Sequence, residues 1–263
     1  MGSDRFGVFA VGSHLVGVPA DRIHEIFQLG DVRVPPNCPP HQRGVAVMRG
    51  GVFPALDLRV CLGHVSARAE NEALVTLLGE REEDHRRWLA ELDASVREDR
   101  EFRLATDPRK CKFGQWYYAF KTDDAVLRAE LAKFEEPHAR IHALAAEVQA
   151  LRAEGGADRA LASIEVARSG LLATLVELFE HTRQAIRDSH KEVGVTVELG
   201  GRRSVLIVDR AEAVAELEPF DEGNDPLAAG ALRVDLVRRL ARWRGSAAPV
   251  LLLDVDRIAA LAG

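Results

Sequence analysis

The chain has 263 residues, with 35 Lys and Arg against 41 Asp and Glu, and its formal net charge is -6 at pH 7. This acidic balance disfavours nucleic-acid binding, which needs a basic face to neutralise phosphates. No apolar run approaches the roughly 18 residues of a membrane span. The first residues also lack the basic and long apolar regions of a secretory signal. We therefore expect a cytoplasmic protein that binds no nucleic acid and does not insert into a membrane.

Short apolar runs broken by glycine and proline predict strands in the first part of the chain, from about residue 6 to residue 63. The same texture returns after residue 191, where residues 193–197 (VGVTV) alternate and Gly200-Gly201 predicts a hairpin turn. Residues 250–253 form a final apolar run. Several short strands with regular turn signals favour a small barrel or a sandwich.

Helices are predicted between about residues 65 and 190, where Ala, Leu, Glu and Arg dominate. The first helix has one apolar stripe, formed by Leu78, His85, Leu89, Leu92 and Val96. A short second helix covers residues 124–134, and a third runs from Pro137 to Gly155-Gly156. The fourth, residues 158–189, has a stripe of Leu161, Ile164, Leu171, Leu175, Leu178, Thr182 and Ile186.

These segments predict an α+β fold in which an antiparallel four-helix bundle interrupts a β-domain. We expect residues 1–64 and 191–263 to form the two parts of that domain, and residues 65–190 to form the helical insert. Insertion into a surface loop costs little closure entropy, so this arrangement is tolerable. The alternative of two independent β-domains is weaker because each flank has too few strands to close on its own.

Residues 33–63 contain a specific pattern: Arg43-Gly44, then Arg49-Gly50, Pro54 and Asp57-Leu58-Arg59. This order resembles the first signature of CheW-like coupling domains, and residues 193–217 resemble the second half of that family. The resemblance implies a pair of small intertwined β-barrels. It also implies a function without chemistry of its own, which is to bridge chemoreceptor cytoplasmic tips to the CheA histidine kinase. Receptor contact is expected at Arg49 and Gly50.

Three histidines and one cysteine in the predicted insert indicate a metal site. His138 and His142 lie four residues apart, hence on one helix face. His85 occupies the apolar stripe of the first helix, and Cys111 follows the next loop. Imidazole nitrogens and a thiolate suit tetrahedral Zn²⁺. On these residues alone, a core histidine, a surface pair and a small buried thiol remain alternatives.

The motifs around these residues resemble the chemoreceptor zinc-binding (CZB) domain over about residues 80–145. They are His85-x-x-Trp, Cys111-x-Phe-Gly-x-Trp and His138-x-x-x-His142. The resemblance implies that His85, Cys111, His138 and His142 bind one Zn²⁺ ion. CZB domains are associated with sensing hypochlorous acid or zinc, so Cys111 is also the expected redox-sensitive residue.

Together the two resemblances predict a chemotaxis signal-transduction adaptor that is not an enzyme and whose zinc site senses oxidant or zinc. A coupling scaffold with a purely structural zinc is the main alternative. A zinc hydrolase is disfavoured because Cys111 as a fourth ligand would close the site to substrate water. The chain also lacks a G-x-x-x-x-G-K loop and a G-x-S-x-G elbow. The long fourth helix adds the expectation of a homodimer formed through the helical insert.

Overall fold

The computed structural model describes residues 5–48, 51–189, 191–220 and 234–261. The chain divides into two compact units, which we call the β-unit (residues 1–70 and 191–263) and the helical unit (residues 71–190). Among the described residues, no helix is both long and apolar enough to cross a membrane.

Two six-stranded sheets form the β-unit. The first contains, in spatial order, β10 (Glu218–Pro219), β11 (Val237–Arg242), β12 (Val250–Leu253), β2 (His14–Pro19), β1 (Arg5–Val11) and β9 (Arg210–Glu216). The second contains β3 (Ile23–Gln28), β7 (Val193–Leu199), β8 (Arg202–Val208), β6 (Gly51–Asp57), β5 (Gln42–Met48) and β4 (Val32–Arg33). The unit also includes the short helical segments η1 (Ala20–Arg22), α1 (Leu58–Cys61), η5 (Val234–Leu236) and α8 (Val255–Leu261).

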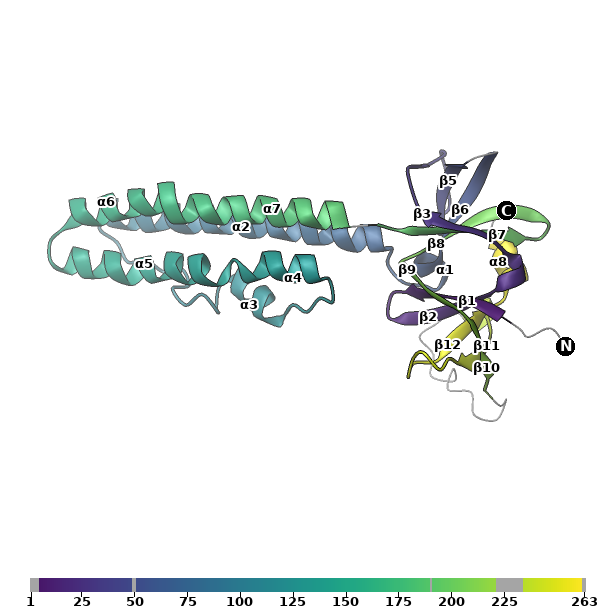
Figure 1. Cartoon of the computed structure of the whole chain (residues 1–263). Coiled ribbons are helices and arrows are strands. Elements are labelled where there is room, and N and C mark those ends of the chain that lie inside the picture. Colours follow the sequence, from purple (N-terminus) through teal and green to yellow (C-terminus); the bar gives the residue numbers. More distant parts are fainter. Residues whose placement is uncertain (1–4, 49–50, 190, 221–233, 262–263) are drawn as a thin grey trace. The chain divides into compact units, whose positions relative to one another are not determined.

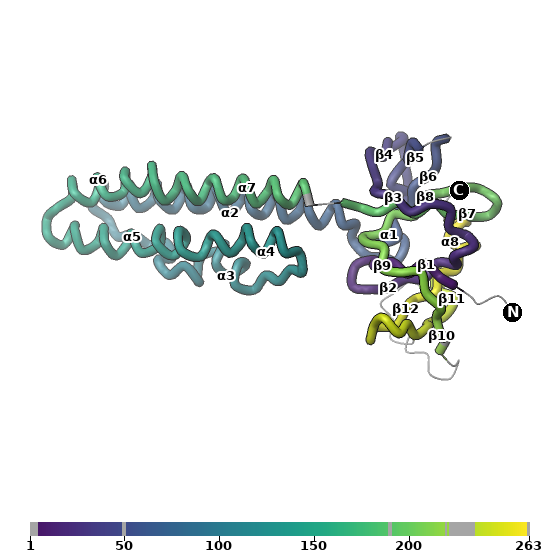
Figure 2. The backbone as a smooth tube through the Cα atoms, in the orientation of Figure 1, coloured from purple at the N-terminus to yellow at the C-terminus, as the bar shows by residue number. Residues whose placement is uncertain are grey.

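Each sheet joins strands from both ends of the chain, and Figure 2 shows purple and blue strands among green and yellow ones. Strand β6 runs parallel to β8, with Ala55 opposite Val205, and β12 runs parallel to β2. The predicted mixed α+β architecture is therefore confirmed, and this pairing excludes two independent β-domains. The described strands leave both sheets open, so the predicted pair of closed barrels is not confirmed.

The core of the β-unit follows from the alternation of side chains between the two faces of each strand, and several strands are apolar on both faces. In β1, Phe9 and Val11 enter the main core, whereas Val8 joins a smaller cluster. The buried side chains include Phe9, Val16, Val18, Leu56, Val195, Val197, Leu206, Val208 and Leu251. The Gly200-Gly201 turn between β7 and β8 has φ values of 55° and 76°. These left-handed values are what a tight two-residue hairpin needs, so the turn was predictable from its glycines.

Asp57 ties the end of β6 to two other elements of the β-unit and is only 3 % exposed. One carboxylate oxygen caps α1 by accepting hydrogen bonds from the backbone N–H groups of Arg59 and Val60, at 3.0 and 3.3 Å. The other lies 3.5 Å from Arg43 Nη1. Arg43 in turn makes two hydrogen bonds of 3.1 Å with Glu192, so these charges satisfy one another inside the unit.

We expect Asp57→Ala to lower the free energy of unfolding by about 2–3 kcal/mol, because it removes a helix cap and leaves a partly buried guanidinium short of one partner. Urea denaturation followed by circular dichroism measures the change. Glu218→Ala is the control, since the Arg244–Glu218 pair is 93 % and 63 % exposed. Removing such a surface pair should change stability by less than about 0.5 kcal/mol. Equal losses in both variants would contradict a structural role for Asp57.

The helical unit contains α2 (Ala67–Arg97), which begins in the β-unit, and α3 (Lys112–Ala119), α4 (Ala125–Ala132) and α5 (Glu135–Ala153). It ends with a continuous segment of α6 (Ala157–Ala167), the π-helical turn η2 (Arg168–Leu172) and α7 (Ala173–Ser189). Figure 1 shows α2, α5 and the α6–α7 segment side by side. The other two helices have eight residues each, so the predicted bundle of four helices is not confirmed in that form.

The π-helical turn changes the face that the last helical segment buries. Buried residues before the turn include Ile164 and Ala167, and the next is Leu172, five residues on instead of three or four. One extra residue in the turn explains this step. The predicted stripe is therefore only partly correct. Its buried members are Ile164, Leu175, Thr182 and Ile186. The other three, Leu161, Leu171 and Leu178, are only partly buried and pack against the core.

Candidate metal centre

The helical unit brings together the four residues that the sequence predicts as metal ligands. His85 lies on α2, Cys111 immediately precedes α3, and His138 and His142 lie one turn apart on α5. One candidate ligand atom from each residue lies within 4.8 Å of the others. The three histidines are 0–3 % exposed, and Cys111 is partly exposed. Among the described residues, this is the one His, Cys, Asp or Glu group close enough together to hold a metal ion.

Two of the imidazoles are oriented by backbone carbonyl groups. His85 Nδ1 lies 2.7 Å from the carbonyl oxygen of Arg81, and His142 Nδ1 lies 3.1 Å from that of Ala105. A carbonyl only accepts, so each Nδ1 carries the proton and each Nε2 keeps a free lone pair. Both Nε2 atoms are buried without a hydrogen-bond partner. Buried polar atoms without hydrogen-bond partners are rare. Both Nε2 atoms belong to the same cluster of four residues, so a shared bound ion would satisfy them.

His138 and Cys111 already contact each other, with Nε2 and Sγ 3.2 Å apart. The other nitrogen of His138, Nδ1, is buried without a partner. In a tetrahedral zinc site with bonds of about 2.0–2.1 Å to nitrogen and about 2.3 Å to sulfur, neighbouring ligand atoms lie roughly 3.3–3.6 Å apart. The contact between Cys111 and His138 is close to this spacing, and all four candidate ligand atoms lie within 4.8 Å of one another. Three imidazoles and a thiol are also the donor types that Zn²⁺ binds.

The sequence around Cys111 places its sulfur. Cys111 is the N-cap of α3, and its Sγ accepts a hydrogen bond from the backbone N–H of Gly114 at 3.1 Å. Gly114 packs so closely on the preceding turn that a Cβ there would lie 1.8 Å from the carbonyl oxygen of Pro108. The ring of Phe113 packs against the histidines, with its centre 4.9 Å from that of His138. In the Cys-x-Phe-Gly motif, the cysteine thus supplies a candidate metal ligand, the phenylalanine packs beside the histidines, and the glycine allows the close backbone contact.

Burial keeps the imidazoles neutral. Desolvation, with the neighbouring histidines, lowers the pKa of His138 to about 3 and that of His142 to about 4. The pKa of His85 is lowered for the same main reason. Desolvation also raises the pKa of the Cys111 thiol, although hydrogen bonds from the Gly114 and Phe113 N–H groups oppose this. Neutral imidazoles are ready to bind a cation, and a bound cation would favour the thiolate.

The other predicted contact residues are Arg49 and Gly50, and they lie outside the described residues. The flanking positions are described: Val47 on β5 and Val52 on β6 face each other across the strand pair and are 59 % and 61 % exposed. Arg59, from the same signature, instead binds Asp209 with N–O distances of 2.8–3.0 Å. Its side chain is 15 % exposed in that ion pair, which indicates a structural role.

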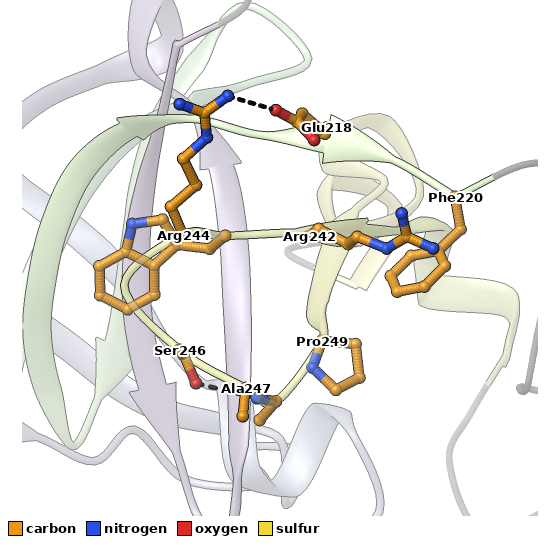
Figure 3. Close-up of a pocket in the computed structure, with 9 residues that line it drawn as sticks. Glu218, Phe220, Arg242, Arg244, Ser246, Ala247 and Pro249 are labelled. Carbon is orange, nitrogen blue, oxygen red and sulfur yellow. Dashed lines mark hydrogen bonds and ion pairs between the residues drawn. The ribbon is translucent and has the colours of Figure 1, made fainter.

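The β-unit has a separate hollow of about 290 Å³ beside β10 and β11 (Figure 3). Its two arginines are already engaged: Arg244 pairs with Glu218 at 3.1 Å, and Arg242 lies 4.6 Å from the centre of the Phe220 ring. No histidine or cysteine lines it. The hollow therefore offers no donor set comparable to that of the metal centre.

Two family models match parts of this chain. The CheW-like domain model matches residues 5–87, and the chemoreceptor zinc-binding domain model matches residues 85–149. The chain combines a CheW-like domain with a chemoreceptor zinc-binding domain. All four residues of the metal centre lie within the CZB match. The second segment of the β-unit, residues 191–263, lies outside both matches but supplies strands to both sheets.

Among solved structures, the chain is similar to the scaffolding protein TtCheW from Thermoanaerobacter tengcongensis, with 11 % sequence identity and a TM-score of 0.42. The similarity covers 97 % of this chain and 90 % of that one. No curated protein matches the chain. The assignment therefore depends on the two family models.

Proposed function

We propose that this protein is a chemotaxis adaptor that couples chemoreceptor cytoplasmic tips to a CheA-type histidine kinase in the cytoplasm, and that it binds one Zn²⁺ ion. The observation that carries the proposal is the buried cluster of three histidines and one cysteine in a chain that also has a CheW-like domain. In the proposed organisation, residues 1–64 and 191–263 are the coupling domain and residues 65–190 are the insert. The strand pairing between the two flanks supports this organisation.

His85, Cys111, His138 and His142 are the proposed zinc ligands. The partnerless Nε2 atoms of His85 and His142, and the short contact between Cys111 and His138, support this set. A bound Zn²⁺ would supply a positive charge that holds the thiolate and cross-links α2, α5 and the start of α3. Four protein ligands leave no position for a substrate water, which favours a sensing or structural metal over a catalytic one.

Cys111 is the proposed redox-sensitive residue, because it is the one partly exposed member of the cluster. With hypochlorous acid as oxidant, the thiolate sulfur gives up two electrons and gains an S–O bond, while chlorine leaves as chloride. The product is a sulfenic acid. The thiolate is then lost as a donor, and only the three imidazoles remain. The start of α3 would be released from α5, which is the change we propose is passed to the partners.

The β5–β6 strand pair is the proposed receptor contact, together with Arg49 and Gly50, which lie between these strands in the sequence. The exposed Val47 and Val52 support it, because paired apolar side chains in water are available to a partner. We also propose a homodimer formed through the helical insert. This proposal rests on the long continuous segment of α6, η2 and α7.

The test is binding to a CheA-type kinase and to receptor tips, measured for zinc-loaded protein before and after one equivalent of hypochlorous acid. We expect oxidation to change kinase binding at least several-fold in wild type, and to leave it unchanged in Cys111→Ser. A wild type that binds the kinase equally before and after oxidation would instead favour a scaffold with a structural zinc. A protein that binds neither kinase nor receptor would contradict the adaptor function itself.

A further inference from the structure

One backbone carbonyl group in the helical unit accepts two hydrogen bonds from side chains of the metal-centre region. The oxygen of Ala105 lies 2.8 Å from Trp88 Nε1 and 3.1 Å from His142 Nδ1. Trp88 comes from α2, three residues after His85, and His142 comes from α5. Ala105 itself belongs to the segment that joins α2 to α3. The Ala105 carbonyl therefore connects α2 and α5 to the segment between α2 and α3 through hydrogen bonds.

The indole ring of Trp88 is buried and packs against two other rings, which restricts the orientation of its N–H. The residue is 5 % exposed. Its ring packs edge-on against Phe102, with centres 5.2 Å apart, and against His142, with centres 5.0 Å apart. The Trp88 N–H therefore holds the Ala105 carbonyl at the position where it can orient the His142 imidazole.

The chain between Ala105 and Cys111 is a tight turn that would transmit a shift of Ala105 to the sulfur. The side-chain carboxylate of Asp107 accepts a hydrogen bond from the backbone N–H of Arg109 at 2.9 Å. The backbone carbonyl of Asp107 accepts one from the backbone N–H of Lys110 at 3.0 Å. Next to this turn, the backbone of Gly114 packs against Pro108. These contacts constrain the backbone between Ala105 and Cys111, so a displacement of Ala105 is expected to reach the sulfur.

We propose that Trp88 is a positioning residue for the metal centre, which acts through Ala105 on His142 and Cys111 and is not itself a ligand. This inference rests on the proposed zinc binding. Hydrogen bonds that orient metal ligands commonly contribute about 10–100-fold to metal affinity. The other oriented histidine differs, because His85 uses the carbonyl of Arg81 on its own helix and needs no outside support. Loss of the Trp88 N–H should therefore disturb His142 and Cys111 but not His85.

The test compares Trp88→Phe with Trp116→Phe. Both substitutions keep an aromatic ring, and Trp116 packs against Phe113 and Phe120 beside the same centre. Zinc affinity is measured by competition with a chromophoric chelator, and the visible spectrum of Co²⁺-loaded protein reports ligand geometry. A second variant carries benzothienylalanine at position 88, which keeps the bicyclic ring and replaces only the N–H with sulfur. It covers the case in which Trp88→Phe does not fold.

We expect both changes at position 88 to weaken zinc binding about 10–100-fold and to shift the Co²⁺ spectrum, with Trp116→Phe like wild type in both measurements. Affinity within twofold of wild type for the position-88 variants would overturn the inference while leaving the zinc site intact. Equal losses in Trp116→Phe would also overturn it, because they would indicate packing alone. A wild type that binds no zinc would instead overturn the proposed site, and the inference with it.

Discussion

Cys111→Ser is expected to weaken zinc binding roughly a hundredfold or more. Structural zinc in small peptides contributes about 10–16 kcal/mol of apparent binding free energy, and an even share for each of four ligands is about 2.5–4 kcal/mol. Each 1.4 kcal/mol corresponds to a factor of ten. Serine keeps the size of the side chain but supplies no thiolate. Elemental analysis and chelator competition measure the stoichiometry and the affinity.

Cys38→Ser is the matched control, because Cys38 lies in the β-unit and its thiol donates to the carbonyl oxygen of Gln42 at 2.8 Å. A serine hydroxyl can make the same bond, so this variant should bind one zinc per chain as tightly as wild type.

The Cys111→Ser variant should also lose stabilisation by zinc. At free zinc about a thousand times the dissociation constant, wild type should gain about 4 kcal/mol in free energy of unfolding over the metal-free protein. The variant should gain far less at the same zinc concentration. Wild-type zinc affinity in Cys111→Ser would remove Cys111 from the ligand set.

Gly114→Ala is expected to destabilise the helical unit by about 3 kcal/mol or more and to weaken zinc binding with it. The added Cβ would lie 1.8 Å from the oxygen and 2.9 Å from the carbon of the Pro108 carbonyl. These are backbone atoms, so the turn before Cys111 must move to accommodate the methyl group. Overpacking in protein interiors typically costs about 1–3 kcal/mol, and a clash with backbone belongs at the top of that range.

Gly79→Ala provides the control for the Gly114 substitution. Gly79 lies inside α2, and the nearest atom to an added Cβ is Arg183 Nη1 at 3.9 Å. Alanine in a helix interior is about 0.5–1 kcal/mol more favourable than glycine, so this variant should be slightly more stable than wild type. Urea denaturation and zinc titration of both variants measure the difference. A Gly114→Ala protein with normal stability and zinc affinity would contradict the close contact with Pro108.

Local periodicity explains why much of the helical unit was predictable. The apolar stripe of the first helix placed His85 among buried leucines, and all five predicted stripe residues are buried. Gly155, at φ 72°, closes the turn after α5 where the sequence predicted the helix to end. The spacing of His138 and His142 put both on one face. In each case, the feature depends on residues close together in sequence.

Other features depend on contacts that no local pattern contains. Helix α3 was not predicted, because its eight residues include a glycine and four aromatic residues, which are weak helix formers. The π-helical turn was also missed, and with it the burial of Leu172 and Phe179 in place of Leu171 and Leu178. Nor could the sequence reveal the Ala105 carbonyl, since every residue has one and only the fold selects which carbonyl orients a histidine.

The pairing of distant strands has a consequence for the order in which the protein folds during synthesis. Arg59 and its ion-pair partner Asp209 are 150 residues apart in the chain, and β6 needs β8 as a neighbour over a similar distance. The first six strands therefore leave the ribosome long before their partners exist, with unpaired edges that invite aggregation. The helical unit is continuous in sequence, so it can fold in the meantime. Its completion holds the two flanks on one folded body, which shortens the search by which the late strands find the early ones.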